Sequence, residues 1–140
     1  MKAVILVERN KHVRQFISRE LQTMGYGVRS FKNGKEFLEE LPTTASGDPI
    51  IIDRELADMD IHQAIAAIRQ HRPHQPIIVH TFDDENGFAH DNNLFVARKQ
   101  SDLGDLIMTL GQVWKIESMN ERENRGWRQR TDQDDNKMAW

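Results

Sequence analysis

The sequence has no cysteine, and this absence alone excludes several kinds of protein. Disulfide-stabilised folds, thiolate zinc sites and cysteine nucleophiles all need that residue. Long apolar runs are also missing, because the longest covers only residues 3–7, whereas a membrane-spanning helix needs about 20 apolar residues. A net charge of −3 is too small to indicate binding to nucleic acid or to a membrane surface. We therefore expect a soluble cytoplasmic protein with no direct nucleic-acid or membrane partner.

Short apolar segments recur along the chain and alternate with stretches of helical periodicity. The apolar segments cover residues 3–7, 28–31, 49–52, 76–79 and 94–97. Helical spacing is found in residues 13–24, 37–41, 61–68 and 103–114, and weak helical character in 83–92. Short buried strands that alternate with helices are typical of βαβ units, whose right-handed crossovers place helices on both faces of a parallel sheet. The pattern predicts an α/β fold built on a doubly wound five-stranded parallel sheet.

Polar side chains stand where four of these strands end. Glu8 and Arg9 follow the first strand, Asp53 follows the third, Thr81 ends the fourth and Lys99 follows the fifth. In an open parallel sheet the carboxyl ends of the strands meet at one edge, and functional groups collect there. The sequence therefore predicts that an acid, a central aspartate, a hydroxyl group and a lysine converge on one site.

The residues around the third, fourth and fifth strands resemble those of a known family. The segment from Asp53 to Asp60 reads Asp-Arg-Glu-Leu-Ala-Asp-Met-Asp and follows Pro-Ile-Ile-Ile. Thr81 follows Ile-Ile-Val-His, and Lys99 precedes Ser-Asp-Leu at 101–103. In order and spacing these motifs resemble a response-regulator receiver domain of the CheY-like superfamily, in a divergent form. The resemblance implies a flavodoxin-like (β/α)5 fold with strand order 2-1-3-4-5.

The resemblance also implies a function, that of a receiver module in two-component phosphorelay signalling rather than an enzyme. Asp53 takes the position of the phospho-acceptor, and Thr81 and Lys99 take the positions that contact the phosphoryl group. The implied ligands for Mg²⁺ are Glu8, Asp53 and the backbone carbonyl of Glu55. The implied partners are a histidine kinase or phosphotransfer protein as donor, and a downstream protein or output domain as target.

Several positions depart from the pattern of that family. Arg9 stands where the family has a second acidic metal ligand, and a guanidinium offers Mg²⁺ no oxygen and repels it. Arg9 therefore counts against Mg²⁺, and it could instead pair with Asp53, in place of the metal or to hold one conformation. Phe82 replaces a small residue, and Val96 replaces the usual switch aromatic. These departures keep an alternative open, a degenerate pseudo-receiver that acts as a phosphorylation-independent protein-interaction module.

The chain changes character near its end. From residue 115 onward it carries six basic and six acidic residues but few large apolar ones. Such a segment cannot form a hydrophobic core of its own. We expect residues 1–116 to form the receiver-like domain and residues 117–140 to be a charged tail or linker, either a helical extension or disordered. A helical extension would offer a surface for a partner or for a homodimer.

Overall fold

A computed structural model of the chain describes residues 2–43, 47–83, 88 and 93–138, with side chains described as far as residue 122. The elements, in chain order, are β1 (Ala3–Val7), α1 (Lys11–Thr23), β2 (Gly27–Phe31), α2 (Gly34–Glu40), the 3-10 helix η1 (Leu41–Thr43), β3 (Ile50–Asp53), α3 (Ile61–His71), β4 (Ile77–Thr81), β5 (Leu94–Arg98) and α4 (Gly104–Met138). Most of 83–92, where the sequence indicates weak helical character, lies outside the described residues. Within the described ranges no helix is both long and apolar enough to cross a membrane.

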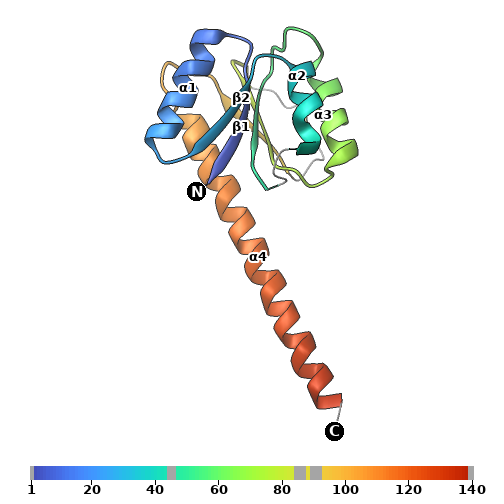
Figure 1. The fold of residues 1–140 in the computed structure, drawn as a ribbon. Helices are drawn as coiled ribbons and strands as arrows, with labels where there is room; N and C mark the ends of the chain where they lie inside the picture. The colour runs from blue at the N-terminus through green and yellow to red at the C-terminus, as the bar shows by residue number, and fades with distance from the viewer. Residues whose placement is uncertain (1, 44–46, 84–87, 89–92, 139–140) are drawn as a thin grey trace.

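The five strands form one parallel sheet in the order β2-β1-β3-β4-β5, which confirms the predicted architecture. Helix α1 and the first part of α4 lie on one face of the sheet, and α2 and α3 lie on the other (Figure 1). Because every strand runs the same way, the carboxyl ends of β1, β3, β4 and β5 reach the same edge. The pairing of β3 with β4 sets Asp53 opposite His80 at that edge.

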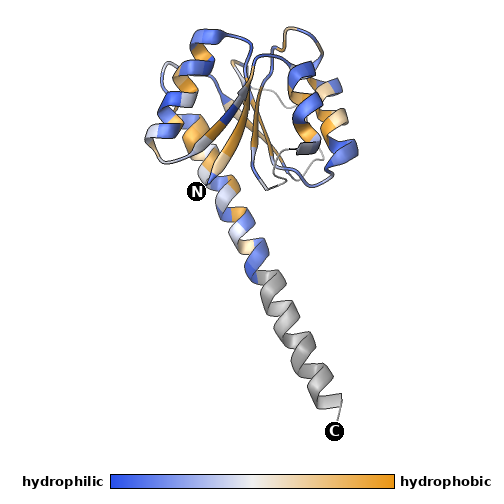
Figure 2. Ribbon diagram, viewed as in Figure 1, coloured by the Kyte–Doolittle hydropathy of each residue, from blue (hydrophilic) through white to orange (hydrophobic). Residues whose placement is uncertain are grey.

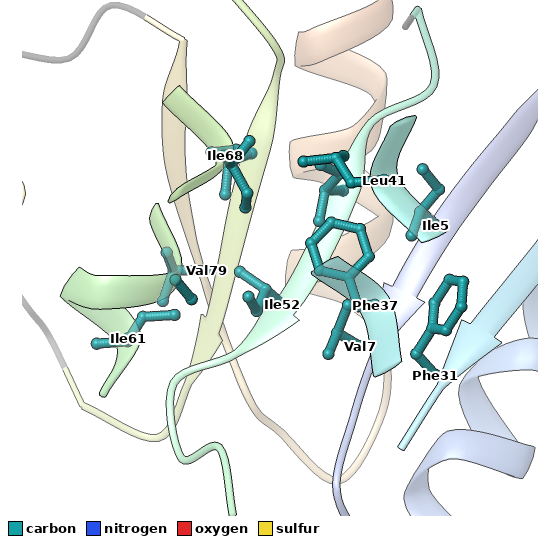
Figure 3. Packing of buried hydrophobic residues seen from close by; sticks show 12 residues of the cluster. Ile5, Val7, Phe31, Phe37, Leu41, Ile52, Ile61, Ile68 and Val79 are labelled. Atoms are coloured by element: carbon teal, nitrogen blue, oxygen red, sulfur yellow. The ribbon is translucent and has the colours of Figure 1, made fainter. Parts of the chain in front are cut away.

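Each face of the sheet carries its own apolar cluster. Ile50 and Ile52 belong to the cluster under α2 and α3, whereas Ile51 belongs to the cluster under α1 and α4. This alternation follows from the two-residue period of a strand. Figure 3 shows the first cluster, in which Phe37 of α2 and Ile61 of α3 are fully buried against the strands. Figure 2 shows the same division, with hydrophobic residues along the strands and on the inward sides of the helices.

Side-chain caps fix where two helices begin next to the carboxyl edge. Asn10 accepts hydrogen bonds from two backbone N–H groups in the first turn of α1, each at 3.0 Å. Asp60 and Gln63 form a capping box at the start of α3. These bonds satisfy N–H groups that the helix itself leaves without acceptors. They also fix where the loops that follow β1 and β3 join their helices.

Helix α4 extends well beyond the predicted segment 103–114, since it begins at Gly104 and continues to Met138. Near the sheet it is held by Trp114, whose ring stacks on Tyr26 with 6.5 Å between centroids. The Nζ atom of Lys2 lies 5.1 Å from the centre of the same Trp114 ring. Past this contact the helix projects away from the sheet (Figure 1). Residues 117–138 therefore lie in the same helix as the residues packed on the sheet.

Candidate functional site

Four of the side chains at the strand ends lie together at the carboxyl edge, and all four are largely buried. Glu8 and Asp53 are 1% exposed, Thr81 is 2% exposed, and the side chain of Lys99 is 11% exposed. Burial of two carboxylates and an ammonium is costly unless the charges neutralise one another. The structure therefore brings together the acid, the central aspartate, the hydroxyl group and the lysine that the sequence indicates.

The ammonium group of Lys99 joins the two carboxylates. Its Nζ atom donates a hydrogen bond to Asp53 Oδ1 at 2.8 Å and lies 3.2 Å from Glu8 Oε1. Within this cluster two negative charges face one positive charge. The ion pairs are strong because little water reaches them, yet one negative charge remains uncompensated.

Backbone and side-chain donors hold the remaining atoms in place. The N–H of Glu55 donates to Asp53 Oδ1 at 3.0 Å, and the N–H of Asn10 donates to Glu8 Oε2 at 3.0 Å. The guanidinium of Arg14 donates to the backbone oxygen of Glu8 at 2.8 Å. Asn10 and Arg14 were not among the predicted site residues. An asparagine just before a helical pattern is a cap signal that points to Asn10, whereas nothing in the sequence marks Arg14.

The two carboxyl groups have opposite pKa shifts. Burial raises the pKa of Glu8, and its interaction with the neighbouring carboxyl group of Asp53 raises it further. Burial also disfavours ionised Asp53, but the interaction with Glu8 and the hydrogen bonds from Lys99 and the Glu55 N–H together hold the pKa of Asp53 below its ordinary value. Asp53 is therefore the stable anion of the pair, and Glu8 takes up a proton more readily.

Two buried carboxylate oxygens keep unused lone pairs. Among the described residues, Asp53 Oδ2 and Glu8 Oε1 accept no hydrogen bond. Mg²⁺ binds hard oxygen ligands and often takes only one or two carboxylates, with water or phosphate completing its shell. The two carboxylates therefore fit such a cation, with the Glu55 carbonyl as the third ligand that the resemblance implies. No set of three or more metal-binding side chains occurs in the described part of the chain, so backbone and water would supply the rest.

Thr81 and His80 end strand β4 beside Asp53. The Thr81 hydroxyl oxygen accepts a hydrogen bond from the N–H of Asp83 at 3.2 Å, which orients it while leaving its own proton for a second partner. His80 is 4% exposed, and burial, reinforced by the charge of Lys99, lowers its pKa to about 4. The site therefore contains a neutral imidazole near pH 7, whose role the sequence does not indicate.

Arg9 and Phe82 line a pocket of about 240 Å³ beside the site, together with Glu8, Lys99 and the α1 residue Phe16. Asp53 and Thr81 do not line this pocket. Arg9 is exposed, and in the described part of the chain the side-chain cation paired with Asp53 is Lys99 rather than Arg9. Phe82 is 71% exposed, and its ring centre lies 5.2 Å from Lys99 Nζ. In the sequence both residues depart from the pattern of the family that the chain resembles, but the sequence does not predict the contact between Phe82 and Lys99.

A family model matches most of the chain. The family is described as the response regulator receiver domain, and the match covers residues 4–95, more than half of the 140 residues. No curated protein matches this sequence.

Solved structures of response regulators share the fold. The chemotaxis protein CheY4 of Vibrio cholerae is 25% identical, with a TM-score of 0.72 over 81% of this chain and 98% of that chain. The response regulator TrrA of Thermotoga maritima, in complex with Mg²⁺–BeF, is 22% identical, with a TM-score of 0.70 over 81% and 99%. The receiver domain of the Francisella response regulator 1452 is 20% identical, with a TM-score of 0.72 over 84% and 99%.

Proposed function

This chain belongs to the response regulator receiver domain family, and we propose that Asp53 is its phospho-acceptor. Receiver domains are signalling modules of two-component systems, and in general they are not enzymes. The receiver function is therefore that of the family, and the proposal concerns the residues that perform it. It assigns the phosphoryl group to Asp53, and its contacts to Thr81 and Lys99.

The contact between Lys99 and Asp53 is the observation that carries the proposal. Lys99 Nζ and the Glu55 N–H both bind Asp53 Oδ1, so this oxygen is occupied. Asp53 Oδ2 accepts no hydrogen bond from the described residues and keeps its lone pairs. Burial disfavours ionised Asp53, but the neighbouring carboxyl group of Glu8 and the hydrogen bonds from Lys99 and the Glu55 N–H lower its pKa. The carboxylate therefore stays ionised. The site thus presents one anchored oxygen and one nucleophilic oxygen.

The transfer step follows from this division of the two oxygens. Asp53 Oδ2 attacks the phosphorus of a phosphohistidine, the new O–P bond forms as the P–N bond breaks, and the electron pair returns to the donor imidazole. Negative charge on the phosphoryl oxygens is then offset by the ammonium of Lys99. The hydroxyl of Thr81 donates its proton to one phosphoryl oxygen as a hydrogen bond. These contacts hold the product on the same buried edge.

Glu8, Asp53 and the backbone carbonyl of Glu55 are the groups that would hold Mg²⁺. The cation supplies positive charge for the phosphoryl oxygens when it is bound. Arg9 supplies no ligand where a second acid is usual, so we propose a weaker Mg²⁺ site than three carboxylates would make.

The proposed donor is a histidine kinase or a phosphotransfer protein, and the proposed target is a downstream protein or an output domain. Because the phosphoryl group would come from a kinase, the proposal includes a cytoplasmic location. We also propose, as a separate point, that the chain forms a homodimer through residues 117–140. Sedimentation of the full chain and of a chain ending at Lys115 tests that point, since an equal oligomeric state would contradict it.

Intact-mass measurement after incubation with a small acyl phosphate, with and without Mg²⁺, tests the phospho-acceptor. We expect the wild type to gain the mass of one phosphoryl group and Asp53→Asn to gain none. Asp83→Asn is the matched control, because Asp83 is an exposed carboxylate at the same edge. It should gain the same mass as the wild type.

Two results would contradict the proposal. A gain that persists in Asp53→Asn would place the phosphoryl group elsewhere. No gain in the wild type, from either an acyl phosphate or phosphoramidate at any Mg²⁺ concentration, would favour the phosphorylation-independent interaction module. The exposed Arg9 and Phe82, which line one pocket, are the features that such a module would use.

A further inference from the structure

Phe82 is the most exposed of the large apolar side chains in the described part of the chain, at 71%. A single exposed apolar side chain is common and needs no explanation by itself. This one has a specific neighbour, because the ammonium of Lys99 lies 5.2 Å from the centre of its ring. The face of an aromatic ring attracts a cation at this distance. The contact therefore connects an exposed residue to the buried charge cluster.

The backbone brings Phe82 and Lys99 close together. The N–H of Lys99 donates to the backbone oxygen of Thr81 at 2.6 Å, which continues the pairing of β4 with β5 past the last paired residues. Phe82 directly follows Thr81 and is thereby held next to Lys99. The hydrogen bond from Asp83 to the Thr81 hydroxyl tightens the same turn.

The ring takes the place of a third neighbour for the ammonium. An ammonium group has three N–H donors. The carboxylates of Asp53 and Glu8 are two of its neighbours, at 2.8 Å and 3.2 Å. Phe82 is the third, and the Lys99 side chain is only 11% exposed. A long lysine side chain loses considerable freedom when it is held in one place, and the ring helps to hold it there.

We propose that Phe82 is a positioning residue for Lys99, which keeps the ammonium aimed at the phosphoryl group on Asp53. This inference rests on the proposed function of Asp53. A preorganised cation stabilises a phosphoryl anion better than one that must first be ordered. Loss of the ring should therefore weaken the hold on the phosphoryl group through Lys99. The aromatic face is the required feature, rather than apolar bulk.

Binding of beryllium fluoride in the presence of Mg²⁺, measured by isothermal titration calorimetry on the full chain, tests this role. We expect Phe82→Ala and Phe82→Leu to weaken binding about two- to fivefold, which is the effect of one partly exposed cation–ring contact. Phe82→Tyr keeps the ring and should bind like the wild type. Phe16→Ala is the matched control, since Phe16 is an exposed phenylalanine that lines the same pocket. It should leave the affinity unchanged.

A second measurement reports on the contact without any phosphoryl analogue. The ring should shift the NMR signals of the Lys99 Hε protons upfield in the wild type and in Phe82→Tyr, and the shift should disappear in the alanine and leucine variants. Equal beryllium fluoride affinity for wild type and Phe82→Ala would overturn the role of Phe82 and leave the phospho-acceptor untouched. A leucine variant that binds like the wild type would overturn it too. Absence of binding by the wild type, together with no gain in mass, would overturn the proposed function and this inference with it.

Discussion

Replacement of Lys99 by methionine leaves two buried carboxylates without their cation. Methionine keeps most of the length of the side chain but loses the ammonium that lies 2.8 Å from Asp53 and 3.2 Å from Glu8. Removal of one partner from a buried ion pair costs about 3–5 kcal/mol of unfolding free energy. We expect the lower end, about 3 kcal/mol near pH 7, because Lys99 is 11% exposed and Glu8 relieves part of the repulsion by taking up a proton.

The pH dependence of this loss has a definite sign. Burial raises the pKa of Glu8, so its favourable contribution to stability is present below its unfolded value and is lost as the pH rises through its folded value. The pKa of Asp53 is lowered by hydrogen bonds, against the effect of burial, so its contribution is present above its unfolded value and is lost in acid. Without the ammonium, Glu8 protonates at a higher pH and Asp53 is less stabilised as an anion. The stability deficit of Lys99→Met should therefore be largest near neutral pH and smaller near pH 5.

Urea unfolding followed by far-ultraviolet circular dichroism at the two pH values measures the deficit. Lys32→Met is the control, because Lys32 is exposed and its replacement should change the unfolding free energy by less than about 0.5 kcal/mol. The double variant Lys99→Met with Glu8→Gln should recover much of the loss, since it removes one of the two facing charges. An unchanged stability of Lys99→Met at neutral pH, or an equal deficit at both pH values, would refute the electrostatic account of this site.

Two further predictions concern Arg9 and the packing of the loop after Asp53. Arg9→Asp introduces a carboxylate beside Glu8 and removes a cation that repels Mg²⁺. We therefore expect Mg²⁺ to bind about tenfold more tightly to the variant in a calorimetric titration. Equal Mg²⁺ affinity in wild type and variant would contradict this. In Gly34→Ala, the new Cβ atom would lie 2.7 Å from Met59 Sδ. Because the Met59 side chain is flexible but partly packed, we expect the free energy of unfolding, measured with urea, to fall by about 1 kcal/mol. An unchanged urea midpoint would show that Met59 moves aside freely.

The strands of the sheet and the order of those strands were predictable for two different reasons. Strands buried on both faces are short, continuous apolar runs, and residues 3–7 and 76–79 have that form. The order of the strands came from the resemblance to a family rather than from periodicity. The sequence left open whether residues 117–140 extend the last helix or are disordered, because the pattern 103–114 ends with the apolar stripe at Trp114, whereas α4 continues to Met138. A polar helix beyond the core has no such stripe, and hydrophobic periodicity therefore cannot find its end.

The site was predictable only as far as strand ends determine it. Glu8, Asp53 and Lys99 meet because parallel strands share one carboxyl edge, and that part needs no side-chain geometry. The directions of the side chains beyond the strands depend on the backbone of each loop. For this reason the sequence left open whether Arg9 pairs with Asp53, whereas the structure pairs Lys99 with Asp53 and leaves Arg9 exposed. The position of the Phe82 ring next to Lys99 could not be predicted for the same reason.

The exchange of an acid for Arg9 alters what this edge of the sheet binds well. Phosphorylation gives Asp53 a group with about two negative charges, and Lys99 compensates only one of them. Arg9 lines the same pocket as Lys99 and adds a second positive charge there, whereas a carboxylate at position 9 would attract a divalent cation and repel the phosphoryl group. Fewer carboxylates hold Mg²⁺ less well but oppose a phosphoryl anion less strongly. Because the phosphoryl analogue binds together with Mg²⁺, its affinity is compared at saturating Mg²⁺. Under that condition, reversal of the charge at position 9 should tighten the binding of Mg²⁺ and weaken the binding of the analogue, as expected if Arg9 acts through charge rather than through shape.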